Sequence, residues 1–516
     1  MVILTYALFG LIVILFYTGK YITDDYKIQN DFRQLLQCVD YRWPGELREN
    51  DILLQYAKYA ESPAISLIYR VGALFMNPIV YGKILSLILF SVTMAMIGWM
   101  VCTRSSFMGG IIAILIISFF PTQIDRFYGI FSRSFSAILY ILLLYFSEKG
   151  NKIGCGIVAT ISAIFYPPVF FLIVVYLVFY VVFTHTWQDK KTLSILAVSM
   201  IAGISFLLLK YFSPSDFVGS LISRDEMYQM IEMHEGGRYP FLPQIFVLTD
   251  LKSRVLQPYY VFLFILCSFL YSPKKLKLPS SISFMFLASI FTYLLALAVS
   301  PRLYLPDRYT RYIIPYLVAY IFGIWTGGIF RLEMSVRKKT VIFLLMFFPG
   351  IYTYQQNIHP GYKMDSIRHK ELYETLRKTP QKSMIAAPPY IADNIPLYSH
   401  RSVLFNYELT HPWYPKYYGV LSERISDFYR SYYNPAPDRV LAFAKKYDVD
   451  YIIVEKEYFT KKYIERGKWL FSPWNDRIRE YIMEVQADKY WWERNSSDLK
   501  KIYNNDGLII VEIIRQ

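Results

Sequence analysis

Four segments of the sequence place charged side chains directly beside long apolar blocks, and the first segment holds two adjacent carboxylates. Asp24 and Asp25 closely follow the apolar block 2–18. Carboxylates beside such a block are costly unless they face water, a cation or a bound substrate. One of the two could act as a general base while the other binds a metal ion or an acceptor group. The alternative is a pair of solvated acids that end a helix.

The second segment is Asp125-Arg126, followed by Arg133. Asp125 could complete a metal site with Asp25, which would then hold a divalent cation such as Mg²⁺ or Mn²⁺. Arg126 or Arg133 could pair with a phosphate. The alternative is a local ion pair whose long side chains extend toward a membrane interface.

The third segment, Ser223-Arg224-Asp225-Glu226, precedes His234 within the long polar stretch 212–255. Loops of this length are uncommon without a function or intrinsic flexibility. We therefore expect Arg224, Asp225 and Glu226 to belong to an acceptor site or a lid. His234 lacks a second histidine at metal-binding spacing and is interpreted as a solvated side chain.

The fourth segment, 301–312, contains Arg302, Arg308 and Arg311 together with three tyrosines. If the segment is helical, Arg308 and Arg311 share one face. Planar guanidinium groups bind phosphate oxygens in a bidentate way. We assign these arginines, with Arg126 and Tyr309, to a phosphate at the membrane surface. The alternative is a basic and aromatic interface belt.

The composition is that of a membrane protein with many spans. Of 516 residues, 54% are hydrophobic and 18% are charged, and the mean hydropathy is +0.28. Soluble domains carry about 25% charged residues. An ordinary soluble enzyme and a disordered chain are therefore excluded. The net charge of +15 is explained by basic cytoplasmic loops and not by nucleic-acid binding.

About eleven apolar blocks are long enough to predict membrane-spanning helices, with ends uncertain by a few residues. They lie at 2–18, 78–101, 106–120, 134–147, 153–166, 168–184, 193–211, 256–271, 281–299, 311–330 and 339–355.

The short loops predict a cytoplasmic N-terminus, because basic residues collect on the cytoplasmic side. This topology requires Tyr166-Pro167-Pro168 to be a tight external turn and not a kink within one helix. It places the loops 19–77, 121–133, 212–255 and 300–310 outside. The loops assigned to the cytoplasm hold few acids and the following basic residues: Arg104, Lys149, Lys152, Lys190, Lys191, Lys274, Lys275, Lys277, Arg331, Arg337, Lys338 and Lys339.

The tail, 356–516, differs from the membrane part, 1–355, because charges return and apolar runs shorten. Alternating elements predict a small external α/β domain. We expect strands at 384–387, 403–405, 451–454 and 508–514, and a helix at 438–447.

Taken together, these features resemble the GT-C superfamily of membrane glycosyltransferases, whose members have many spans and often a soluble C-terminal domain. The resemblance implies that Asp24 and Asp25 correspond to the acids of the first external loop, and Asp125, by position alone, to that of the second. Arg308 and Arg311 resemble the basic residues that meet the donor phosphate. The stretch 445–454 resembles a helix-to-strand passage in tails of this group.

The resemblance implies an inverting transfer of sugar from a polyprenyl-phosphate-linked donor to an acceptor hydroxyl on a glycan, lipid or protein. It further implies a bacterial inner membrane with the tail in the periplasm. The Trp-Trp-Asp-Tyr-Gly motif of oligosaccharyltransferases is absent, and Tyr490-Trp491-Trp492-Glu493 does not replace it. This departure argues against transfer to asparagine.

Two other classes of protein stay open at this point. An O-antigen-type polymerase or ligase also uses external arginines, although such enzymes rarely end in a separate α/β domain. A non-enzymatic transporter of lipid-linked glycans would carry mid-span charges or paired repeats, and the spans here are almost free of acids.

Overall fold

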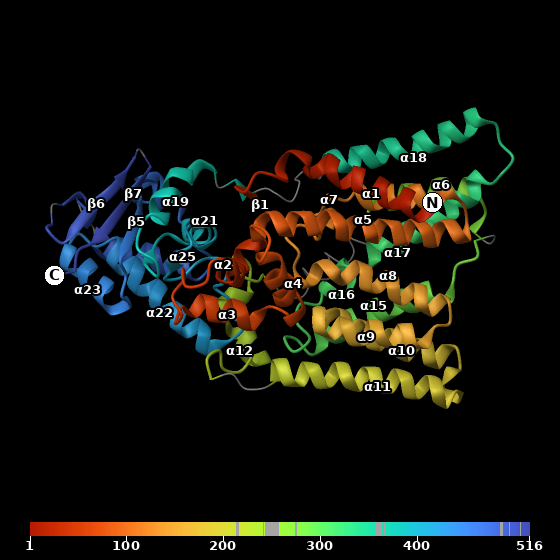
Figure 1. Ribbon diagram of the computed structural model, residues 1–516, viewed down its shortest axis with the longest axis horizontal. Helices are drawn as coiled ribbons and strands as arrows, with labels where there is room; N and C mark the ends of the chain where they lie inside the picture. The colour runs from red at the N-terminus through yellow and green to blue at the C-terminus, as the bar shows by residue number, and fades with distance from the viewer. Residues whose placement is uncertain are drawn as a thin grey trace.

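The computed structural model shows a helical bundle with a small sheet at one end (Figure 1). It describes residues 1–212, 216–240, 242, 257–273, 276–356, 364–365, 367–485, 489–494, 496–505 and 507–515. Lys274, Lys275 and most of 241–256, on which parts of the predicted topology rest, lie outside the described residues.

Each of the eleven predicted apolar blocks forms a helix. These helices are α1 (Val2–Thr18), α5 (Pro78–Arg104), α6 (Phe107–Ser118), α8 (Ser136–Glu148), α9 (Lys152–Phe165), α10 (Pro167–Phe183), α11 (Lys190–Leu207), α14 (Pro258–Leu270), α15 (Ser280–Ala298), α17 (Ile314–Phe330) and α18 (Val336–Gln356). Within the described residues, four segments are long and apolar enough to cross a membrane by length and composition: α5, α15, the segment Lys190–Lys210 around α11 and the segment Arg308–Phe330 around α17. The exact number of spans stays a prediction.

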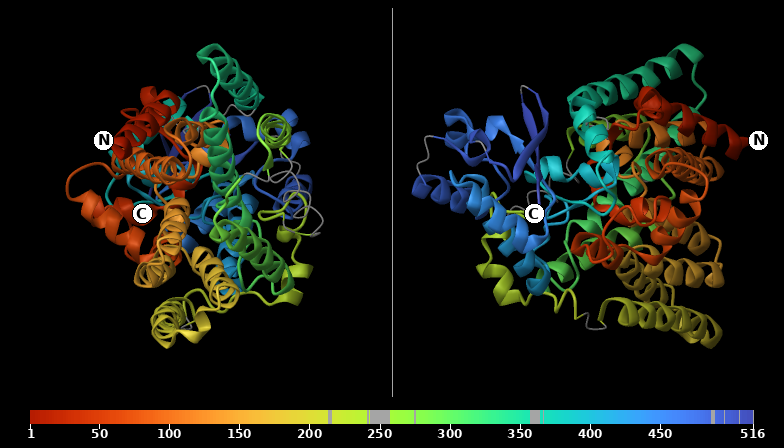
Figure 2. Two further views of the ribbon diagram at one scale, coloured as in Figure 1. Left: turned by 90° about the vertical axis from the view of Figure 1, so that its right-hand side faces the viewer. Right: turned by 60° about the vertical axis from the view of Figure 1, so that its left-hand side comes forward.

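Small residues allow the central helices of the bundle to approach closely. A side chain at Gly109 of α6 would collide with the backbone of Gly323 in α17, so glycine is required at this crossing. Such contacts are typical of helices that pack within a membrane. By contrast, α11 and α18 lie at opposite edges of the bundle (Figures 1 and 2).

The Tyr166-Pro167-Pro168 segment is a turn, as predicted. Helix α9 ends at Phe165, Tyr166 is extended, and α10 begins at Pro167 and runs back beside α9 (Figure 1). The loops after α5, α8, α10 and α17 consequently lie at the end of the bundle away from the sheet (Figure 1).

The first long loop folds into three short helices between the bundle and the sheet: α2 (Leu36–Arg42), α3 (Ile52–Ala60) and α4 (Pro63–Ala73) (Figure 1). Asp51 caps α3 by accepting hydrogen bonds from the amides of Leu53 and Leu54. Ser62 caps α4 by accepting from the amide of Ile65, and Pro63 fits its first turn. A 3₁₀ turn, η2 (Asn30–Gln34), precedes α2.

The tail forms a mixed five-stranded sheet in the order β4-β3-β5-β7-β6. Strand β3 is parallel to β4 and β5, whereas β7 is antiparallel to β5 and β6. The strands are β3 (Met384–Ala386), β4 (Ser402–Val403), β5 (Tyr451–Glu455), β6 (Leu499–Asn504) and β7 (Leu508–Ile513). The helices around them are α19 (Lys370–Arg377), α20 (Pro389–Ala392), α21 (Ile395–Ser399), α22 (Pro415–Tyr432), α23 (Pro437–Tyr447), α24 (Lys461–Arg466) and α25 (Trp474–Val485).

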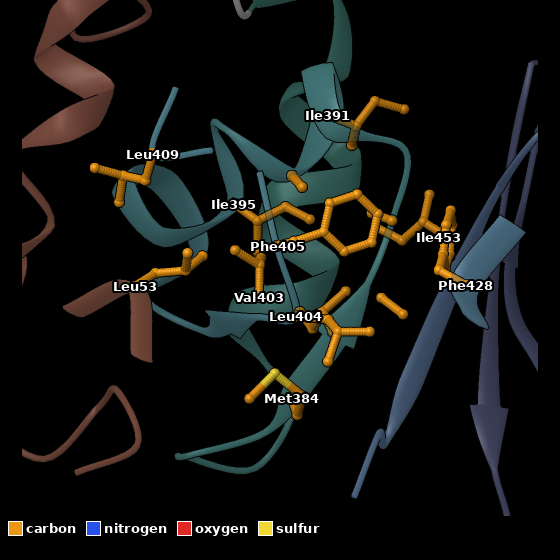
Figure 3. Packing of buried hydrophobic residues seen from close by; sticks show 14 of the residues in the cluster. Leu53, Met384, Ile391, Ile395, Val403, Leu404, Phe405, Leu409, Phe428 and Ile453 are labelled. Carbon is orange, nitrogen blue, oxygen red and sulfur yellow. The ribbon is translucent and has the colours of Figure 1, made fainter. Parts of the chain in front are cut away.

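The first loop and the tail share one hydrophobic core. Leu53 of α3 belongs to the same buried cluster as Val403, Phe405 and Ile453 of the tail (Figure 3). In addition, β1 (Lys27–Ile28) pairs antiparallel with β2 (Met364–Asp365). The first loop is therefore fixed against the sheet and not free in solvent.

Candidate active site

Asp25 lies in the first loop and presents an unpartnered buried oxygen. Its Oδ2 accepts a hydrogen bond from Nδ2 of Asn77 at 3.3 Å, while its buried Oδ1 has no hydrogen-bond partner among the described residues. Burial raises the pKa of Asp25; the charge of Lys83 opposes this rise and that of Asp24 adds to it. A carboxylate with a raised pKa is a stronger proton acceptor, which suits a general base.

Lys83 holds the acidic loop in place. Its Nζ donates to the carbonyl oxygens of Tyr21 and Asp24 at 2.7 and 2.5 Å. The carboxylate of Asp24 instead accepts from the amide of Tyr26 at 3.0 Å and so closes a local turn. The two predicted acids thus have different surroundings, and Asp25 is the better candidate for chemistry.

A second group of charges forms what we call the arginine cluster: Arg126, Arg133, Arg308 and Arg311, gathered around Tyr312. Arg308 donates to the Tyr312 hydroxyl. The guanidinium of Arg126 lies over the Tyr312 ring, 5.8 Å from its centroid. The structure thus brings together Arg126, Arg308 and Arg311, which the sequence assigned to a phosphate.

Hydrogen bonds from neighbouring helices hold the loop that carries Arg126. Ser134 Oγ donates to the Arg126 carbonyl at 2.8 Å. Ser86 of α5 and Tyr69 of α4 donate to the carbonyls of Phe127 and Gly129, at 2.6 and 2.5 Å. These contacts fix the loop backbone from three directions.

The cluster contains two carboxylates in ion pairs. Asp31 of η2 pairs with Arg133. Burial disfavours its ionisation, but Arg133 and Asn30 outweigh that cost and hold the pKa of Asp31 well below its usual range. Asp307 lies 3.0 Å from Arg311 and 3.6 Å from Nε of Arg308.

Arg126 is the unpaired cation of this cluster. Among the described residues it forms no ion pair, and its buried Nε has no hydrogen-bond partner. Burial lowers the pKa of Arg126 to about 10. The positive charges of Arg311, Arg133 and Arg308 also lower it, whereas Tyr312 raises it. The site around Arg126 is therefore electropositive and can accept an anion.

The remaining predicted residues have varied positions. Arg302 is exposed, Asp125 is half-buried in the turn before Arg126, and Tyr309 is buried with its hydroxyl donating to the Leu303 carbonyl at 2.7 Å. The charges that act most on the pKa of Asp25 are those of Lys83 and Asp24. Within the described structure, no contact is seen between Asp25 and Asp125 or the arginines. Their convergence on one substrate stays a prediction.

The segment predicted as an acceptor site or lid begins a short helix, α12 (Arg224–Gln229). Ser223 and Glu226 form a capping box, each side chain bonding to the other residue's amide. Arg224 donates to the Ala298 carbonyl at 2.7 Å, and Asp225 is exposed. The side chain of Glu226 therefore has a local structural role.

The predicted divalent cation gains little support from side-chain geometry. Among the residues that the structure describes, no three histidine, cysteine, aspartate or glutamate side chains are grouped to hold a metal ion. One unpartnered oxygen on Asp25 does not make a chelating site.

Sequence reasoning missed Asp31, and it noted Tyr312 only as one of three tyrosines in the segment 301–312; both organise the arginine cluster. Asp31 is only a few residues from Asp25 in the sequence, but its partner Arg133 is far along the chain. The signal that could have found it is the run of polar residues Asn30-Asp31 between apolar positions, which is typical of a turn with buried contacts.

No family model and no curated protein matches the sequence. The fold, however, is similar to that of the Archaeoglobus fulgidus oligosaccharyltransferase tethered to an acceptor peptide with an NVT sequon. The TM-score is 0.52 at 11% identity, over 93% of this chain and 72% of that chain. The chain has a GT-C fold.

Two other solved GT-C structures are similar to a lesser degree. ArnT from Cupriavidus metallidurans, bound to undecaprenyl phosphate, gives a TM-score of 0.46 at 11% identity, over 98% of this chain and 97% of that chain. The arabinofuranosyltransferase AftD from Mycobacteria gives 0.47 at 10% identity, over 100% and 40%.

Proposed function

We propose that this GT-C protein is a glycosyltransferase that moves a sugar from a polyprenyl-phosphate-linked donor to an acceptor hydroxyl. The observation that carries the proposal is Arg126, a half-buried guanidinium without a carboxylate partner among the described residues, beside three further arginines. Buried charges are normally paired. An anionic substrate group would supply the missing partner.

The phosphate of the donor suits the arginine cluster. Guanidinium groups bind phosphate oxygens through paired N–H donors. Arg126 and Arg133 both have buried N–H groups without hydrogen-bond partners in the described structure. When the bond between the sugar carbon and the phosphate oxygen breaks, negative charge grows on that oxygen. Donors fixed beforehand at this point lower the barrier.

Asp25 is the proposed general base. The acceptor hydroxyl gives its proton to Asp25 Oδ1 while its oxygen attacks the anomeric carbon from the side opposite the phosphate. The carbon–phosphate oxygen bond breaks, the polyprenyl phosphate leaves with the electron pair, and the configuration of the sugar inverts. Burial of Asp25 supports this role because it raises the pKa of the carboxyl.

We also propose that the reaction takes place on the external face of a bacterial inner membrane. Arg104 ends α5, Lys149 follows α8 and Lys190 begins α11, all at the end of the bundle opposite the sheet (Figure 1). By the positive-inside rule, that end is cytoplasmic and the sheet is periplasmic. Nucleotide sugars are confined to the cytoplasm, so a donor on the sheet side has to be lipid-linked.

The test compares Asp25→Asn with Asp24→Asn in purified protein, with a panel of labelled polyprenyl-phosphate sugars. We expect Asp25→Asn to lose roughly 10²- to 10⁴-fold in kcat because the proton acceptor is gone. Asp24→Asn should lose less than about tenfold, since its carboxylate closes a turn. Full turnover by Asp25→Asn would show that the base is another residue.

The pH dependence gives a second measurement of the same assignment. Asp25 must be ionised to accept a proton, so kcat falls as the pH drops through its raised pKa. The acidic limb of the wild-type profile should therefore lie above the ordinary range for aspartate, about 3.9. A profile that stays flat down to that range would contradict the assignment.

A further inference from the structure

Glu408 of the tail holds the turn η2 of the first loop. It is 2% exposed, and its Oε1 accepts from Nδ2 of Asn30 at 2.7 Å although the two residues are 378 positions apart. Its Oε2 accepts from Nε2 of Gln34 at 2.9 Å, and Nη2 of Arg33 lies 3.2 Å from Oε1. One carboxylate thus binds three side chains of a five-residue turn.

Further charges complete this interface, which we call the seam network: Arg33, Arg238, Asp393 and Glu408. Arg33 Nη1 lies 2.9 Å from Asp393 Oδ2, and Arg238 Nη2 lies 3.4 Å from Glu408 Oε2. The Glu408 amide donates to Asp393 Oδ1 at 2.8 Å. Two guanidinium groups therefore face two carboxylates.

Asn30 links the seam network to the arginine cluster. Its amide group has two N–H donors. Its Nδ2 donates one of them to Glu408 and also lies 3.3 Å from Oδ1 of Asp31. Its oxygen accepts from Arg33. Since Asp31 pairs with Arg133, an unbroken line of polar contacts runs from Glu408 through Asn30 and Asp31 to Arg133.

We propose that Asn30 is a positioning residue of the phosphate site, which orients Asp31 against Arg133 while Glu408 of the tail holds it in place. The assignment of this site to a phosphate rests on the proposed function. The line of contacts from Glu408 to Arg133 is independent of it. The proposal assigns the tail a role in donor binding although no contact within the described structure joins Glu408 itself to the arginine cluster.

The physical reason is the precision that a phosphate site requires. Without Asn30, Asp31 loses the hydrogen bond that sets its rotamer, and Arg133 loses a fixed partner. Four like charges then repel one another and occupy a range of orientations. Donors misplaced by even 1 Å bind phosphate less well.

The experiment uses the full chain in lipid nanodiscs and the variants Asn30→Ala, Glu408→Ala and the double variant, with undecaprenyl phosphate as the probe. Asn30→Ala should weaken binding about tenfold in the otherwise unchanged protein. In the Glu408→Ala background the same change should cost less than about twofold, because the line of contacts is already broken. Equal losses in both backgrounds would overturn the proposed positioning role of Asn30.

Two further variants separate positioning from general damage. Glu408→Gln keeps an oxygen that can accept from Asn30 and should restore most of the affinity lost in Glu408→Ala. Glu423, which is 61% exposed and pairs with Lys446, provides the control: Glu423→Ala should bind like the wild type. A Gln variant as weak as the Ala variant would contradict the role of the hydrogen bond.

Hydrogen exchange measured in the same nanodiscs without undecaprenyl phosphate keeps the inference independent of the proposed function. Amides of residues 126–135 should exchange faster in Asn30→Ala and in Glu408→Ala than in the wild type. Unchanged exchange in both variants would overturn the proposed positioning role of Asn30, whatever the protein binds. Faster exchange combined with no wild-type binding of the lipid phosphate would overturn only the proposed function.

Discussion

The arginine cluster and the seam network are both built from buried or half-buried charges on the sheet side of the bundle, yet their charges are balanced differently. In the seam network, Arg33 and Arg238 each lie within 3.4 Å of a carboxylate. In the arginine cluster, Arg126 forms no ion pair among the described residues and is surrounded by other arginines.

This difference indicates which group awaits a ligand. A buried ion network that is satisfied within the chain adds rigidity, and removal of one member leaves an uncompensated charge. A cluster with unsatisfied cations costs stability in the free protein and recovers that cost when an anion binds. Stability and activity should therefore respond in opposite ways to substitutions in the two groups.

The largest effect is expected from Arg33→Ala. This change leaves Asp393 and Glu408 buried without a main partner, and we expect a loss of about 3–5 kcal/mol in the free energy of unfolding. The measurement is chemical denaturation in detergent micelles. Lys58→Ala, which breaks an exposed pair with Asp40, is the control and should cost less than about 1 kcal/mol. Equal losses of stability in Arg33→Ala and Lys58→Ala would show that the seam network is no more important for stability than an exposed ion pair.

Arg126→Ala should give the opposite pattern. It removes a donor for the phosphate and should lower kcat by roughly 10²- to 10³-fold. The thermal unfolding midpoint should stay the same or rise, because repulsion from Arg133, Arg308 and Arg311 is relieved. Transfer assays and thermal scans on one preparation measure both quantities. A strongly lowered midpoint would show that Arg126 is structural.

The smallest effect concerns pH. Burial raises the pKa of Asp393 to about 7; Arg33 opposes this rise and Glu408 adds to it. Since the folded pKa lies above the unfolded value of about 3.9, the contribution of Asp393 to stability is complete below pH 4 and is lost as the pH rises through 7.

Asp393→Asn removes this titration. Between pH 5 and 7, the unfolding midpoint of the wild type should fall relative to that of the variant by roughly 2 °C. Comparison with the variant cancels the titration of other groups that both proteins share. Parallel curves across this range would show that Asp393 keeps one protonation state.

The membrane part could be predicted from the sequence because its signal is local. Long apolar blocks marked all eleven helices within a few residues, and the Pro-Pro pair after Tyr166 marked a turn. The short helices α3 and α4 were not assigned, although Asp51 and Ser62-Pro63 are recognisable start signals.

The sheet was only partly foreseen. The buried strands β3, β4, β5 and β7 were predicted from their apolar runs, as was helix α23. Strand β6 was missed because Lys500 and Lys501 interrupt its apolar pattern at the edge of the sheet. Edge strands carry such charges to avoid pairing with other chains, which weakens their sequence signal.

The contacts of the site could not be read from the sequence, because they join distant positions. Arg126 and Arg308 were chosen from residue type and from their place beside apolar blocks, while Asp31, Asn30 and Glu408 gave no such signal. Nothing in local spacing indicates that Glu408 meets Asn30 across 378 residues. A polar residue acquires its role from the partner that the fold brings to it.

The core shared by Leu53 and the sheet has a consequence for biosynthesis. Leu53 leaves the ribosome long before Phe405 and Ile453 of the tail, which belong to the same buried cluster. The first loop therefore keeps an exposed apolar face until the tail has been translated and, in the topology that we propose, translocated. The first loop and the tail therefore cannot mature in separate stages; they become native together, once both have been synthesised.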